Sequence, residues 1–125
     1  MIVAAVMAGA TPSIAELRHQ RRVLIIAAPA ASDPRVAAQR AMLSGWTRGA
    51  EDRDLTTVEV LADRVSGTRD EAATLRRRYH LAPTRFTLVL VGKDGHEALR
   101  VTDPLPIQQL QNAIDAMPMR RAGQR

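Results

Sequence analysis

The amino-acid sequence predicts an α/β domain in which helices cover a central sheet. Val23–Ala28 is apolar at every position and Phe86–Val91 at nearly every position. Such runs are typical of strands that are buried on both faces. Helix-start signals lie between and after these two runs, so each long strand has a helix available to cover it. The length of 125 residues corresponds to one domain, and no internal repeat or low-complexity block divides it.

The composition excludes several classes of chemistry. The chain contains no cysteine, which excludes disulfides, thiol nucleophiles and cysteine-ligated metals. No apolar run reaches the roughly 20 residues that a transmembrane helix needs. Apolar residues make up 46% and charged residues 25% of the chain, a balance that is typical of a folded domain rather than a disordered one.

The net charge of +5 is unevenly distributed along the chain. Residues 120–125 form a basic tail that holds three of the arginines, and without it 15 basic and 13 acidic side chains remain. The only aromatic residues are Trp46, Tyr79 and Phe86, so platforms for base stacking are scarce. We therefore expect no nucleic-acid partner. A run of arginines at Arg76–Arg78, together with the tail, is the alternative site for a polyanion.

The first twelve residues allow two interpretations. Residues 1–10 are apolar and small, and Ala8-Gly9-Ala10 fits the small-x-small pattern of a signal-peptidase site. Residues 1–12 are therefore either a truncated secretory signal peptide or an apolar N-terminal segment that packs on the domain. The first interpretation predicts a periplasmic or secreted protein, and the second leaves a cytoplasmic location open.

We place the domain at residues 13–119. Its first half begins with a capping box at Ser13–Glu16 and a short helix to about His19. After the strand at 23–28, Asp33-Pro34 combines a favourable N-cap with proline at the first helical position. A helix is expected from there through about residue 46, with an exit loop made by Gly45, Gly49 and the charged residues 51–54. Thr56–Leu61 is rich in β-branched residues and predicts a second strand.

In the second half, Thr68–Glu71 has the spacing of another capping box, and the helix after it carries Ala72, Leu75 and Tyr79 on one face. The strand at 86–91 is followed by Lys93-Asp94-Gly95, a strong turn signal, and by a return strand at 97–101. A last helix carries Ile107, Leu110, Ile114 and Met117, and Pro118 is expected to end it.

This order of elements resembles the thioredoxin-like fold and, more closely, the domain of unknown function called P-DUDES. The similar segments are Arg22–Ile26 with Pro29, Asp33–Arg35, Phe86–Gly95 and Ile114–Arg120, and the resemblance covers nearly all of residues 14–119. It implies a three-layer α/β/α sandwich with a mixed four-stranded central sheet and residues 23–28 in its middle. The first two strands would be parallel, and the last two would run against them. P-DUDES domains of bacteria often follow secretion signals, so the resemblance also implies export.

The chain departs from the thioredoxin pattern where that pattern carries its chemistry. Redox cysteines of thioredoxins follow the first central strand, at a helix start, where this chain has Pro29–Arg35. Without a thiol, disulfide exchange and peroxide reduction are excluded. Arg85-Phe86 occupies the place of the cis-proline before the third strand. The resemblance therefore implies a non-catalytic domain that acts as a binding or interaction module for a protein or a small anion.

Ligand sites in open α/β sheets gather beyond the strand ends, next to helix N-termini. Ser32, Asp33, Arg35 and Arg85 are expected there, and the free backbone N–H groups of the helix start together with the two arginines predict an anion or ligand site. The alternative is that Asp33 caps the helix and pairs with Arg35 or Arg85. Besides the ligand site and the local cap, a third hypothesis is that the protein is an enzyme without thiol chemistry, whose active site is formed by Ser32 to Arg35.

The sequence identifies no catalytic residue, metal site or cofactor. A serine nucleophile needs an adjacent base, and no histidine lies near Ser32 in the sequence. His19, His80 and His96 are scattered without the spacing of metal ligands. We therefore expect neither a metal nor a cofactor.

Overall fold

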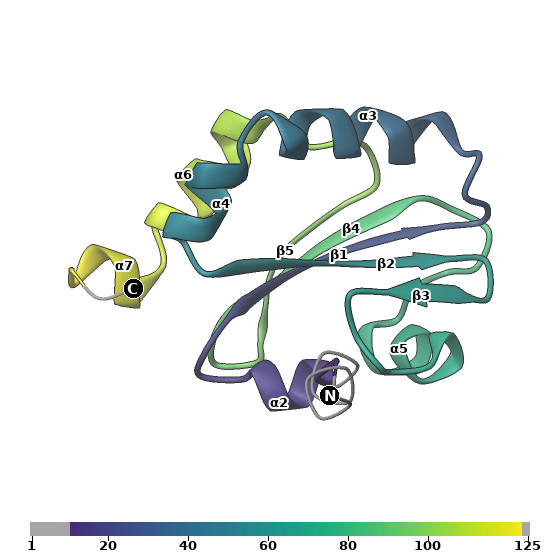
Figure 1. Ribbon diagram of the computed structural model, residues 1–125, viewed down its shortest axis with the longest axis horizontal. Coiled ribbons are helices and arrows are strands. Elements are labelled where there is room, and N and C mark those ends of the chain that lie inside the picture. The colour runs from purple at the N-terminus through teal and green to yellow at the C-terminus, as the bar shows by residue number, and fades with distance from the viewer. Residues whose placement is uncertain (1–10, 124–125) are drawn as a thin grey trace, which may run out of the picture.

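The computed structural model describes residues 11–123 as three layers, with a mixed sheet between two layers of helices (Figure 1). The strands are β1 (Arg22–Ala28), β2 (Leu55–Leu61), β3 (Arg64–Ser66), β4 (Thr87–Val91) and β5 (Glu97–Val101). The described helices are α2 (Ile14–Leu17), α3 (Pro34–Ser44), α4 (Thr47–Asp52), α5 (Ala72–Tyr79), α6 (Ile107–Asp115) and α7 (Pro118–Arg121). The predicted three-layer α/β/α architecture is confirmed.

Strand order in the sheet is β3-β2-β1-β4-β5, which places β1 in the middle as predicted. It is parallel to β2 and antiparallel to β4. The prediction of four strands missed β3, a three-residue return strand that pairs with the end of β2. The last strand, β5, pairs antiparallel with β4 and so runs in the same direction as β1. Its predicted direction was wrong, because the tight turn around Gly95 (φ +86°) reverses the chain.

Side chains of β1 point alternately to the two faces of the sheet, as the pleat requires. Val23, Ile25 and Ala27 join one core, which α2 and α5 cover. Leu24, Ile26 and Ala28 join a second core, to which α3 and α6 contribute. Figure 1 shows α3, α4 and α6 on one side of the sheet and α2 and α5 on the other. Because both faces are covered, all seven residues of β1 are buried.

The first predicted capping box is confirmed and the second is wrong. Ser13 Oγ accepts from the backbone N–H of Glu16, and Glu16 Oε1 accepts from the backbone N–H of Ser13. Thr68 does not cap α5, which begins at Ala72 without a side-chain cap. Its hydroxyl instead lies 2.7 Å from the Asp70 carboxylate and 3.1 Å from the Pro12 carbonyl, either of which can accept its one proton, and the Asp70 carboxylate also accepts from the backbone N–H of Ile14. Thr68 therefore ties the loop before α5 to the start of the described chain.

Two helix ends differ from the prediction. The helix from Pro34 ends at Ser44, and Thr47–Asp52 forms α4 where a loop was expected. The Trp46 indole lies against Gly49, where a Cβ would approach its Nε1 to 2.1 Å, so α4 needs a glycine at that position. Pro118 was expected to end a helix, and it also begins one, since it occupies the first turn of α7. The expected basic tail is thus helical as far as Arg121. In the described part, no helix has the length and apolar character to span a bilayer.

A buried glutamine on α3 fixes the loop before α6. Gln39 is wholly buried, its Nε2 donates to the Leu105 carbonyl at 3.2 Å, and its Oε1 accepts from the Leu105 N–H at 2.7 Å. Both polar backbone groups of a buried residue are thus satisfied by one side chain. The same contact ties the loop before α6 to the middle of α3.

We predict that Gln39→Leu destabilises the protein by about 2 kcal/mol or more, because it leaves the N–H and C=O of Leu105 buried without partners. The free energy of unfolding in urea measures this change. Gln108→Leu is the matched control, since Gln108 is exposed on α6 and its one partner among the described residues is Asn112, and it should change stability by less than about 0.5 kcal/mol. Equal effects of the two variants would contradict the assigned role of Gln39.

Candidate functional site

A polar cleft of about 370 Å³ lies beyond the C-terminal end of β1. Three segments that adjoin strand ends form it: the β1–α3 connection, the turn before β4 and the loop after β5. It is lined by Pro29, Asp33, Arg35, Thr84, Arg85, Phe86, Thr102 and Asp103. The cleft is therefore at the sheet edge where ligand sites of α/β folds gather.

Asp33 occupies the N-terminus of α3 with its own carboxylate. Its Oδ1 accepts from the backbone N–H of Arg35 at 2.9 Å, and its carbonyl accepts from the N–H of Val36 at 3.0 Å. Pro34 has no N–H to offer. The helix-start donors that the sequence assigned to a ligand are therefore taken by Asp33, which favours the capping alternative for that residue.

The two arginines of the cleft differ in how firmly they are held. Arg35 is half exposed and lies between two carboxylates, 3.8 Å from Asp33 and 3.5 Å from Asp103. Long, exposed ion pairs of this kind contribute only about 0–1 kcal/mol. Arg85 is exposed and, within residues 11–123, makes no ion pair or hydrogen bond. Both guanidinium groups are therefore available to a ligand.

The structure thus brings three of the four predicted site residues to one cleft, namely Asp33, Arg35 and Arg85. Ser32 is exposed and is not among the lining residues. Sequence reasoning missed Thr84, Thr102 and Asp103. Asp103 could have been found from its position just after β5. The C-terminal ends of β5 and β1 lie at the same edge of the sheet, because the two strands run in the same direction.

The cleft offers no histidine to a serine nucleophile. The three histidines of the chain are all absent from its lining, and of its two carboxylates Asp33 is engaged in the cap of α3. Across residues 11–123, His, Asp and Glu side chains also do not gather in threes at a place that suits a metal ion. The chemistry that this cleft offers is hydrogen bonding and charge.

The family comparison covers nearly the whole described chain. The family described as a domain of unknown function, DUF4174, matches residues 13–123. The chain belongs to this family. No curated protein matches the sequence.

Solved structures show that this DUF4174 domain has the thioredoxin fold. It is similar to the reduced 2-Cys peroxiredoxin of Plasmodium vivax, with a TM-score of 0.65, 10% identity, and coverage of 87% of this chain and 84% of that one. It is also similar to a thioredoxin-fold protein from Helicobacter pylori, with a TM-score of 0.52, 10% identity, and coverage of 78% and 69%. The predicted thioredoxin-like fold is confirmed. Because this DUF4174 chain contains no cysteine, the likeness does not extend to thiol chemistry.

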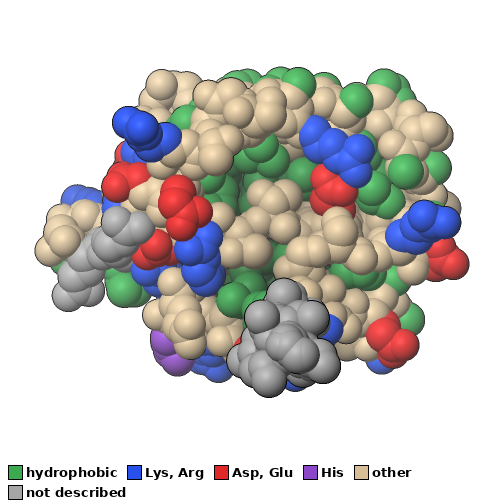
Figure 2. Space-filling model, in the orientation of Figure 1, with side chains coloured by type: hydrophobic (Ala, Val, Ile, Leu, Met, Phe, Trp, Pro, Cys, Tyr) green, Lys and Arg blue, Asp and Glu red, His purple; other side chains and the backbone are tan. Residues whose placement is uncertain are grey.

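The opposite end of the DUF4174 sheet, where β1 and β2 begin, carries a cluster of charged side chains. Arg53 forms two hydrogen bonds to the Asp115 carboxylate, at 3.0 and 3.1 Å, and lies 5.4 Å from the centre of the Trp46 ring. This guanidinium holds the pKa of Asp115 below its usual range. Arg120 of α7 reaches the same carboxylate at 3.5 Å. Figure 2 shows positive and negative side chains intermixed at this end of the molecule, where α4 and α7 lie. The cluster joins α4, α6 and α7.

Proposed function

We propose that this DUF4174 domain is a non-catalytic binding domain whose cleft beyond β1 accepts a small anion. The observation that carries the proposal is that Arg85 has no acidic partner in the described part and shares the cleft with Arg35. Guanidinium groups bind carboxylate, phosphate and sulfate through paired, charge-assisted hydrogen bonds. The anion would lie where the two arginines face the same open volume.

The charges around the cleft set the strength expected of this binding. Asp33 is committed to the helix cap, so its carboxylate only partly offsets the arginines. Asp103 is largely exposed and 3.5 Å from Arg35, and a ligand oxygen can replace it at little cost. An exposed site of this kind supports affinities in the millimolar range, where the free energy of binding is about −4 kcal/mol.

A catalytic function at the same place has less support. An enzyme that used Ser32 to Arg35 would need a nucleophile with a base in reach and donors for a developing negative charge. Ser32 lies outside the cleft lining, and Asp33 has taken the helix-start donors. Binding through Arg35 and Arg85 requires none of these groups, so we favour it.

We also propose that the domain is of the P-DUDES type and is exported to the periplasm or the medium. The four segments that resemble P-DUDES support the first part, and the apolar residues 1–10 with Ala8-Gly9-Ala10 support the second. Residues 1–10 lie outside the described residues. The Pro12 carbonyl accepts hydrogen bonds from Thr68 and Arg69, so cleavage after Ala10 would leave those contacts intact.

We predict that phosphate, sulfate and acetate, titrated separately, shift the amide resonances of Asp33, Arg35 and residues 84–86, with dissociation constants in the millimolar range. Arg85→Ala should weaken this binding at least threefold and Arg35→Ala less, because Arg35 is already shared with two carboxylates. Arg48→Ala, an exposed arginine on α4, is the control of equal charge change. Shifts that are absent at 50 mM anion, or that persist in both cleft variants, contradict the proposed site.

Export predicts that the mature protein begins at or near Thr11. Mass spectrometry of the protein purified from its native source, with separate cytoplasmic and extracytoplasmic fractions, measures the N-terminus. A start at Thr11 in the extracytoplasmic fraction is the expected result. An intact Met1 in the cytoplasmic fraction alone would remove the export proposal.

A further inference from the structure

The first residue of β1 is an arginine whose side chain is only 1% exposed. Arg22 donates from Nε to the Met117 sulfur at 3.2 Å and from Nη1 to the Arg53 carbonyl at 2.8 Å. Neither of these acceptors carries a charge, and in residues 11–123 the Nη2 nitrogen makes no hydrogen bond. Arg22 is therefore a buried cation that uses Nε and Nη1 for uncharged acceptors, and none of the described residues accepts from its Nη2.

Within residues 11–123, the nearby carboxylates form no ion pair with Arg22, because each pairs with another cation. Asp54 pairs with Lys93 at 2.8 Å and lies 4.0 Å from Arg21, and Asp115 pairs with Arg53 and Arg120. Burial is the largest influence on the pKa of Arg22 and lowers it; the positive charge of Arg120 also lowers it, and the carboxylates of Asp54 and Asp115 act in the opposite direction. Burial of a charge is unfavourable, and an anion in direct contact with the guanidinium would offset part of that cost.

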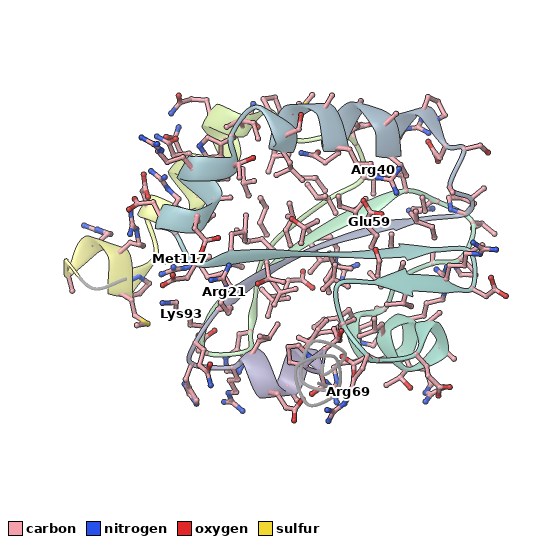
Figure 3. All side chains as sticks on the ribbon, in the orientation of Figure 1. Arg21, Arg40, Glu59, Arg69, Lys93 and Met117 are labelled. Carbon is pink, nitrogen blue, oxygen red and sulfur yellow. The ribbon has the colours of Figure 1, made fainter. Side chains whose placement is uncertain are left out.

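Arg22 lines a cavity of about 210 Å³ between the β4–β5 turn and the start of α7. The cavity also contains Lys93, which is 7% exposed and whose ammonium group has two protons beyond the one given to Asp54. Ala98, Met117, Pro118 and Met119 are its apolar lining residues, and Gly92, Asp94, His96 and Glu97 complete the lining. Figure 3 shows Lys93 and Met117 at the same end of the sheet. Two buried cationic groups thus meet a largely apolar cavity.

We propose that this cavity binds a small organic monocarboxylate, with the carboxylate on Arg22 beside Lys93 and a short apolar chain against the two methionines. The site lies at the opposite sheet edge from the cleft of Arg35 and Arg85 and shares no residue with it, so it goes beyond the proposed function. Each of the two sites can fail without the other.

The residues around the cavity select the class of ligand. A planar carboxylate matches the geometry of a guanidinium group. The flexible methionine side chains adapt to an aliphatic chain, which a bare phosphate or sulfate lacks. Asp94 and Glu97 also line the cavity and are exposed at its mouth, so they oppose a doubly charged anion more strongly than a singly charged one. The cavity volume of about 210 Å³ suits a small ligand rather than a polymer.

The test is a nuclear magnetic resonance titration of the full chain with butyrate, with butyramide as the neutral analogue of the same shape. We expect butyrate to shift the amides of Gly92, Lys93 and Met117 with a dissociation constant of a few millimolar or lower, and butyramide to bind at least tenfold more weakly. Phosphate and sulfate should leave these amides unchanged. Acetylglycyl-leucine, which carries its carboxylate on a peptide end, distinguishes a free acid from a chain terminus.

Two variants keep the result interpretable. Arg22→Met removes the charge and should weaken butyrate binding at least tenfold, while Ala98→Phe retains Arg22 but fills the cavity from β5 and should weaken it equally. Arg48→Met, with the same charge change on exposed α4, should bind like the wild type. The proposal is overturned if butyrate gives no shift, if butyramide binds as tightly, if both cavity variants bind normally, or if only the peptide binds.

Discussion

Burial of β1 on both faces is the constraint on which the other elements depend. Each of its residues has an exposed fraction of 2% or less, from Arg22 to Ala28. A strand in that position needs a hydrogen-bonded neighbour on each side and a helical layer on each face, and β2, β4 and the two sets of helices supply these. The two ends of β1 are then the places where the chain must leave the core, and polar residues gather at both.

The arginines at the two ends of β1 differ in their exposure to solvent. At the C-terminal end, Asp33 satisfies the helix start and the arginines lie in an open, exposed cleft, where solvent screens them. At the N-terminal end, Arg22 is held inside the protein by a sulfur and a carbonyl, and screening there is weak. A ligand at the first end gains little from each contact, whereas a ligand at the second end would relieve an unfavourable burial. For this reason, the ligand proposed for the cavity at Arg22 is a more specific class than the ligand proposed for the cleft at Arg35 and Arg85.

The parts of the fold that local signals determine could be predicted from the sequence. The continuous apolar runs of β1 and β4, the Asp33-Pro34 helix start and the Lys93-Asp94-Gly95 turn are each complete within a few residues. The two elements that the prediction missed, β3 and α4, lack such local signals. Strand β3 is a three-residue edge strand with mainly exposed residues, and α4 has a glycine and a run of charges that are typical of a loop until Trp46 is placed over Gly49.

The candidate sites were harder to predict because their partners are distant in the sequence. Gln39 contacts Leu105, 66 positions later, and Arg22 contacts Met117, 95 positions later. Nothing in the neighbourhood of either residue indicates that its side chain is buried. Asp33, Arg35 and Arg85 could be anticipated, since they adjoin strand ends that the topology brings to one edge.

Amide hydrogen exchange of the full chain tests most directly whether β1 is the element that organises this domain. We expect the amides of β1 and β4 in their shared ladder to exchange most slowly, at the rate of global unfolding, and those of β3 and β5 to exchange through smaller openings. Exchange of the β1 amides as fast as that of β3 or β5 would contradict it.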